Sequence, residues 1–342
     1  MDLQPIRFKQ LSLITFFIGF FFNYLLGQNN LSLESLMASP FPSHLSASPD
    51  GEMVAWVYNE KGVRNIWVSS NVSDSGRKLS NYSLDNGETL YDLQFSSDNK
   101  FIVYVKGDGP NRSGEIPNPT SQPDGTRREI WKISIKDGKS QKITEGHSPS
   151  LSNDSRHLAF LQGGKLWLKN IENLIPPAEM VHARGNISQI NWSPEAEVHK
   201  ITFVSNRGDH SFIGIYELEN HQLKYLSPSV DLDSSPVWSP DGKQIAFLRA
   251  PNQPFLPFIE RRSGLGWSVM LGDISSGESQ LLWTTPQAAG SVFRFISGER
   301  QLYWGANGQL IFPYEGSSWT HLYSLNITTK HVKDLSPGKG EV

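Results

Sequence analysis

The sequence predicts an all-β protein: a β-propeller of about six four-stranded blades, or an incomplete ring of seven or eight, after an N-terminal signal peptide. Three observations lead to this fold class. Past residue 40, short alternating apolar runs occur in place of the helical spacing of apolar residues. A turn motif recurs along the chain. The 29 Gly and 21 Pro in 342 residues are too many for a helical protein and too few for a disordered one.

The N-terminus has the pattern of a secretory signal. Arg7 and Lys9 precede an apolar run over residues 11–26, and polar residues follow Gly27. The run is shorter than the roughly 20 residues of a transmembrane helix, so no stable membrane span is expected after cleavage. A retained N-terminal anchor is the alternative. We expect a signal peptide over 1–27, a linker over 28–39 and the propeller over 40–342, in a protein exported to the periplasm or the extracellular space.

Each repeated unit contains a turn of the Ser-Pro-Asp-Gly type. Pro presets the backbone, Asp bonds its own backbone and Gly takes the left-handed conformation, so this PDG-type motif closes a hairpin. The third turn residues are 41 to 66 residues apart, a period typical of propeller blades or solenoid units. The six copies, of which the last is degenerate, are residues 48–51, 96–99, 152–155, 193–196, 239–242 and 305–308.

Strands follow each turn in a fixed order. The apolar run after the turn predicts a buried strand, and the next strand carries Trp or Tyr in every unit. A short fourth strand ends several units, for example residues 77–80 and 332–336. Four antiparallel strands cannot bury both faces of a blade, so neighbouring blades must stack. We therefore expect the recurrent aromatic residues to pack between blades.

Charge and cysteine content exclude several classes of function. Lys and Arg number 31 against 34 Asp and Glu, and the net charge of −3 gives no reason to expect nucleic acid or an anionic membrane as partner. The chain has no Cys. That excludes disulfides, thiolate zinc sites and a cysteine nucleophile.

The sequence assigns no catalytic residue. A hydrolase nucleophile elbow needs Gly-x-Ser-x-Gly, and the nearest strings, residues 146–150 and 316–320, lack the second Gly. A triad assembled from scattered Ser, His and Asp is the alternative. The nine His are dispersed, so no metal and no cofactor is expected. Residues 85–88 and 231–233 offer carboxylates to calcium, but turns and strand ends explain them more simply.

Two long insertions are not accounted for by blade construction. Residues 107–128 and 250–266 exceed the usual hairpin length, and such loops on a rigid scaffold often carry function. Their carboxylates could bind a peptide ammonium group and their Arg a carbonyl or carboxylate. Solvated loops, or packing against another domain, are the alternative. The candidate substrate contacts are Glu115, Asn118, Arg127, Arg128, Glu260, Arg261 and Arg262.

The repeats resemble the PDG-type blades of the Tol-system periplasmic propeller. They also resemble the N-terminal propeller of the prolyl-oligopeptidase superfamily of serine peptidases, in its dipeptidyl-peptidase IV and acylaminoacyl-peptidase branches. Three stretches favour the peptidases: residues 107–131, residues 258–269, and residues 312–323 with 335–342. The third has a Trp-x-His-Leu-Tyr strand followed by Leu-Ser-Pro-Gly, which is similar to the family pattern. The resemblance covers nearly all of residues 40–342.

The resemblance implies a propeller of seven or eight blades that restricts access to an α/β-hydrolase domain. This sequence shows six blades, and neither the hydrolase region nor a matched double-Glu motif for the peptide's amino end occurs in it. The first hypothesis is thus the non-catalytic, truncated propeller portion of an exported serine peptidase, whose partners are a peptide substrate or a hydrolase domain. It would gate and position peptides for proteolysis.

The second hypothesis is a standalone Tol-like periplasmic propeller that binds proteins. The two differ in ring closure. A standalone ring should pair its terminal segments, residues 43–47 and 331–336, in one blade, because a closed ring removes free sheet edges.

Overall fold

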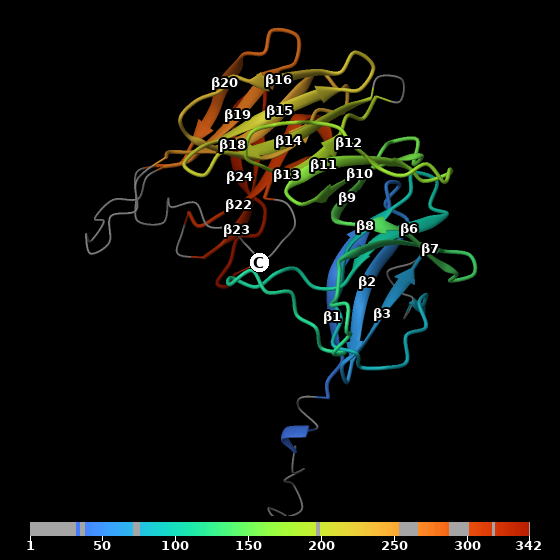
Figure 1. Cartoon of the computed structure of the whole chain (residues 1–342). Helices are drawn as coiled ribbons and strands as arrows, with labels where there is room; N and C mark the ends of the chain where they lie inside the picture. The colour runs from blue at the N-terminus through green and yellow to red at the C-terminus, as the bar shows by residue number, and fades with distance from the viewer. Residues whose placement is uncertain are drawn as a thin grey trace, which may run out of the picture.

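The computed structural model describes residues 32–34, 38–70, 76–195, 199–252, 266–286, 301–316 and 319–341. Over these residues the chain forms six four-stranded antiparallel blades, which confirms the predicted all-β propeller (Figure 1). The predicted signal peptide lies outside the described residues. In the part of the chain that is described, no helix has the length and apolar character needed to cross a membrane.

Consecutive strands build each blade from the inner strand outward. Blade 1 holds β1 (Phe41–Ala47), β2 (Val54–Glu60), β3 (Val63–Ser69) and β4 (Arg77–Lys78). Blade 2 holds β5 (Leu90–Phe95), β6 (Phe101–Lys106), β7 (Glu129–Ser134) and β8 (Ser140–Glu145). Blade 3 holds β9 (His147–Leu151), β10 (His157–Gln162), β11 (Lys165–Asn170) and β12 (Ala178–Glu179).

The second half of the ring repeats this order. Blade 4 holds β13 (Asn186–Trp192), β14 (Lys200–Asn206), β15 (Ser211–Glu217) and β16 (Gln222–Leu226). Blade 5 holds β17 (Leu232–Trp238), β18 (Gln244–Ala250), β19 (Ser268–Asp273) and β20 (Ser279–Thr284). One parallel pairing, Ser211 with Leu232, links these two blades. Blade 6 holds β21 (Tyr303–Trp304), β22 (Gln309–Tyr314), β23 (His321–Asn326) and β24 (Val332–Asp334).

The Ser-x-Asp turn between the first two strands of a blade is held by its own side chains. In blade 1, Ser48 Oγ donates to Asp50 Oδ1 at 2.5 Å and accepts from Met53 N at 2.8 Å. Gly51 closes the turn at φ +74°. The same Ser–Asp bond recurs at residues 96 and 98, 152 and 154, and 239 and 241. The turn motif therefore sets where the second strand of each of these blades begins.

The core lies between blades as five apolar clusters. They join blades 1 and 2, 2 and 3, 3 and 4, 4 and 5, and 5 and 6. Trp131, Trp167 and Trp267 belong to these clusters, as the sequence predicted. Trp67 differs, because it stacks on Trp56 within blade 1, with ring centroids 6.4 Å apart.

Among the described residues, none of the five clusters joins blade 6 to blade 1. We call this boundary the seam. The residues of β2 that alternate with Trp56 and Tyr58 pack toward blade 2, so these aromatic side chains lie on the opposite face of blade 1. The terminal strands β1 and β24 belong to different sheets. The pairing of chain ends expected of a standalone ring is thus not present in the described strands.

Candidate functional site: a central channel

The inner strands of all six blades surround one cavity of about 640 Å³. Each blade contributes to its wall, from Leu45 and Ala47 of β1 to Tyr303 of β21. Wall residues of several blades are polar or expose backbone, among them Gln94, Ser188 and Asn191. The cavity is therefore a channel along the propeller axis with a mixed polar and apolar wall.

A β-bulge with a left-handed residue interrupts five of the six inner strands. The pairing register of the inner strand shifts in each of blades 1 to 5. The left-handed residues are His44, Asp92, Ser148, Gln189 and Ser235, with φ between 51° and 53°. Such conformations are uncommon for residues other than Gly and persist only where the surroundings hold them. Bulges turn backbone groups away from the ladder, and they are frequent beside binding sites.

Side chains at or beside these bulges tie blade 2 to blade 3 and blade 4 to blade 5. Asp92 Oδ2 accepts a hydrogen bond from Ser148 N at 3.2 Å. Gln189 Oε1 accepts one from Ser235 N at 2.6 Å. The pattern repeats two residues later, where Asn191 Nδ2 donates to Pro236 O at 3.0 Å. At these two boundaries the channel wall is therefore held by bonds from one blade to the next.

Three titratable residues meet at the blade 2 and blade 3 side of the channel. Burial raises the pKa of Tyr91 to about 12, although Arg128 opposes this shift. Burial, together with Arg128, lowers the pKa of His147 to about 4, so this imidazole is neutral at pH 7. Its Nδ1 lies 3.0 Å from Ser148 Oγ. Arg128 is therefore a positively charged neighbour of both Tyr91 and His147.

His147 and Ser148 do not complete a catalytic triad. Asp92 accepts a hydrogen bond from the backbone N of Ser148, which is not the carboxylate–imidazole bond by which a triad orients its base. Gly146 leads into strand β9 and not into a helix. The string 146–150 is therefore a bulged inner strand without the strand-to-helix turn of a nucleophile elbow.

Of the predicted substrate contacts, Arg128 alone is tied to residues near the channel in the described part of the chain. Glu115 bonds Asn111 at 3.0 Å within its own exposed loop. Asn118 closes a turn with Gln122. Arg127 pairs with Glu145 at 3.0 Å and is two-thirds exposed. The contacts predicted on the second insertion, Glu260, Arg261 and Arg262, lie outside the described residues.

Two of the carboxylates considered for calcium, Asp233 and Glu88, have cationic partners. Asp233 is 1% exposed and receives two bonds from Arg249, at 2.7 and 2.9 Å. Burial raises the pKa of Asp233 against the effect of Arg249. Glu88 pairs with Lys106 at 3.0 Å. These groups act as structural ion pairs.

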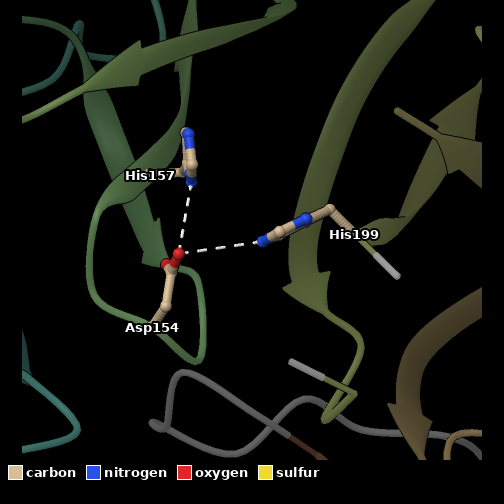
Figure 2. A group of neighbouring side chains, drawn as sticks. All are labelled: Asp154, His157 and His199. Carbon is tan, nitrogen blue, oxygen red and sulfur yellow. Dashed lines mark ion pairs between the residues drawn. The ribbon is translucent and has the colours of Figure 1, made fainter. Parts of the chain in front are cut away.

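A group that the sequence analysis did not anticipate lies between blades 3 and 4. Asp154 of the blade 3 turn, His157 at the start of β10 and His199 just before β14 point toward one another (Figure 2). Asp154 Oδ2 is 3.7 Å from His157 Nδ1 and 3.8 Å from His199 Nε2. Spacing along the chain could not reveal this group, because the two His are on different blades.

Comparison with known proteins shows which fold the chain shares with solved structures. No family model matches it, and no curated protein does. Among solved structures, it is similar to an oligogalacturonate lyase of Vibrio parahaemolyticus, with 12% identity and a TM-score of 0.62 over 88% of this chain and 80% of that one. It is also similar to dipeptidyl peptidase 4 of Porphyromonas gingivalis, with 10% identity and a TM-score of 0.56 over 99% of this chain and 50% of that one.

A third similar structure is TolB of Acinetobacter baumannii, with 17% identity and a TM-score of 0.52 over 85% of this chain and 65% of that one. At these identities the likeness shows the propeller fold, in agreement with the Tol-like and peptidase-like repeats of the sequence. The chain spans half the length of the dipeptidyl peptidase and about two thirds of the TolB chain.

Proposed function

We propose that this chain is the non-catalytic propeller portion of an exported prolyl-oligopeptidase-like serine peptidase. Its role would be to gate and position peptides for proteolysis by a hydrolase domain. The observation that carries the proposal is the channel, whose wall all six blades share. A channel of about 640 Å³ with backbone groups freed by bulges suits an extended peptide, which needs hydrogen bonds along its main chain.

The seam supports a role within a larger protein. Blade 1 carries Trp56, Tyr58 and Trp67 on the face turned away from blade 2, and none of the described apolar clusters covers that face. An apolar sheet face ordinarily packs against another layer. A further blade or a neighbouring domain would bury it, as the similarity to half of a dipeptidyl peptidase also favours.

A plugged channel tests this function. Ala47 is an exposed channel residue of β1, and Ala178 is an exposed residue of β12, outside the channel wall. We expect the purified chain to bind fluorescein-labelled unstructured peptides, and Ala47→Trp to weaken that binding at least tenfold by filling the channel. Ala178→Trp should leave the affinity unchanged. Equal binding by both variants in fluorescence anisotropy would show that peptides do not use the channel.

A further inference from the structure

We infer that Asp154, His157 and His199 form a binding site for a divalent transition metal of the zinc type at the boundary of blades 3 and 4. Two imidazole nitrogens and one carboxylate oxygen are ligands that such metals prefer. The three donor atoms lie within 4.8 Å of one another. The three side chains are each partly exposed, which leaves a fourth position open to water.

The two donor separations that include Asp154 fit a metal after a small contraction. Metal–ligand bonds of about 2.0–2.1 Å in a tetrahedron place neighbouring donors roughly 3.3 Å apart. The two donor pairs that include Asp154 are 3.7 and 3.8 Å apart. His157 Nδ1 is buried and has no hydrogen-bond partner within the described structure. A buried nitrogen without a partner is costly, and a metal bond would satisfy it.

The surroundings of His199 are those of a metal ligand. Its Nε2 faces Asp154, while its Nδ1 is 3.5 Å from Glu219 Oε1. A second carboxylate on the far nitrogen is the usual support of a metal-bound imidazole, because it fixes the tautomer and the ring orientation. Glu219 also accepts from His199 N at 2.9 Å, which places this carboxylate independently of the ring.

The indole ring of Trp192 packs against both imidazoles and holds them in place. Its ring centroid is 5.9 Å from that of His199 and 6.4 Å from that of His157. Trp192 is itself anchored, since its Nε1 donates to Ser150 O at 2.8 Å. The rings therefore approach Asp154 from packed positions rather than from free rotamers.

Blade construction does not require a His at position 157. Asp154 Oδ1 already serves the turn by accepting from Ser152 Oγ and Arg156 N, which leaves Oδ2 facing the His pair. The residue whose N bonds the turn Ser is His157 in blade 3, but it is Met53, Phe101, Lys200 and Gln244 in blades 1, 2, 4 and 5. The turn thus forms with unrelated side chains at this position, and His157 is available for a ligand.

Metal titration of the purified chain tests the site. We expect one Zn²⁺ per chain by calorimetry, and visible d–d absorption of tetrahedral strength when Co²⁺ replaces Zn²⁺. His157→Gln and His199→Gln should each weaken Zn²⁺ binding at least tenfold and remove the Co²⁺ bands. His331→Gln, on an exposed residue of blade 6, should change neither. Equal Zn²⁺ affinity in all variants, or no saturable binding, would overturn the inference.

A second measurement covers the case in which a variant fails to fold. Diethyl pyrocarbonate modifies free imidazoles of the unaltered chain, and mass spectrometry reads each His separately. Zn²⁺ should protect His157 and His199 and leave His331 reactive. Equal reactivity of His157 and His199 with and without Zn²⁺ would contradict the site.

Discussion

At the residue scale, burial decides which charged groups matter to this propeller. Asp233 and Arg249 face each other across β17 and β18, and Arg249 also donates to Ser227 O at 2.8 Å. Lys100 and Asp98, at 2.8 Å, form an ion pair on exposed side chains. Each buried charge loses its hydration, and only the attraction of its partner offsets that cost. The attraction within an exposed pair is screened by water.

Arg249→Met should therefore destabilise the chain by about 3–5 kcal/mol, because it leaves the buried carboxylate of Asp233 without its partner. The double variant Asp233→Leu with Arg249→Met should recover much of this loss. Urea unfolding followed by Trp fluorescence measures both. Lys100→Met is the control and should leave the midpoint unchanged. A small effect of Arg249→Met, similar to that of the control, would mean that the pair is not a structural one.

His147 predicts a pH dependence of stability. Its pKa is lowered to about 4 in the folded chain from the ordinary value of 6.5, so between these values the unfolded chain binds the extra proton. Stability contributed by this group is complete above about pH 6.5 and is lost as the pH falls toward 4. We expect a loss of about 2 kcal/mol, since solvent screens part of the shift.

The thermal midpoint of the chain, measured between pH 7 and pH 4, should fall less in His147→Gln than in the unaltered chain. Parallel curves for the two proteins would show that His147 is not the group that titrates.

At the element scale, the bulged inner strands explain how the channel is built. Gln189 combines a left-handed backbone with a side-chain bond to the next blade. Gln189→Gly should lose the bond but relieve the backbone, whereas Gln189→Val should lose the bond and add strain. We expect the Val variant to be less stable than the Gly variant by roughly 1–2 kcal/mol in urea unfolding. Equal stability would mean that the bulge relaxes freely.

The turns and strands also show which structural features can be predicted from residues close together in the sequence. Turns such as residues 48–51 were predictable, because Ser48, Asp50 and Gly51 interact with one another and with the next strand. The bulges were not, since the register of an inner strand depends on bonds to the next blade. For the same reason the sequence placed no residue at the channel wall and missed the approach of His157 to His199.

At the scale of the whole molecule, the order of the blades follows from the sequence repeat. The seam between blades 6 and 1 depends instead on which blade faces are covered by apolar residues of another blade. The aromatic stack of Trp56, Tyr58 and Trp67 read as inter-blade packing in the sequence, but in the described structure no apolar cluster covers it. In the structure the loop residues Glu115, Asn118 and Arg127 bond Asn111, Gln122 and Glu145, and their contact with a substrate stays a prediction.

The most direct measurement is the mass of the native protein in its source, detected with an antibody to the propeller. If the chain is the front of a serine peptidase, the band should lie well above 38.3 kDa, and a fluorophosphonate serine-hydrolase probe should label it. A band at or below 38.3 kDa without that label would contradict this function and favour a standalone binding propeller.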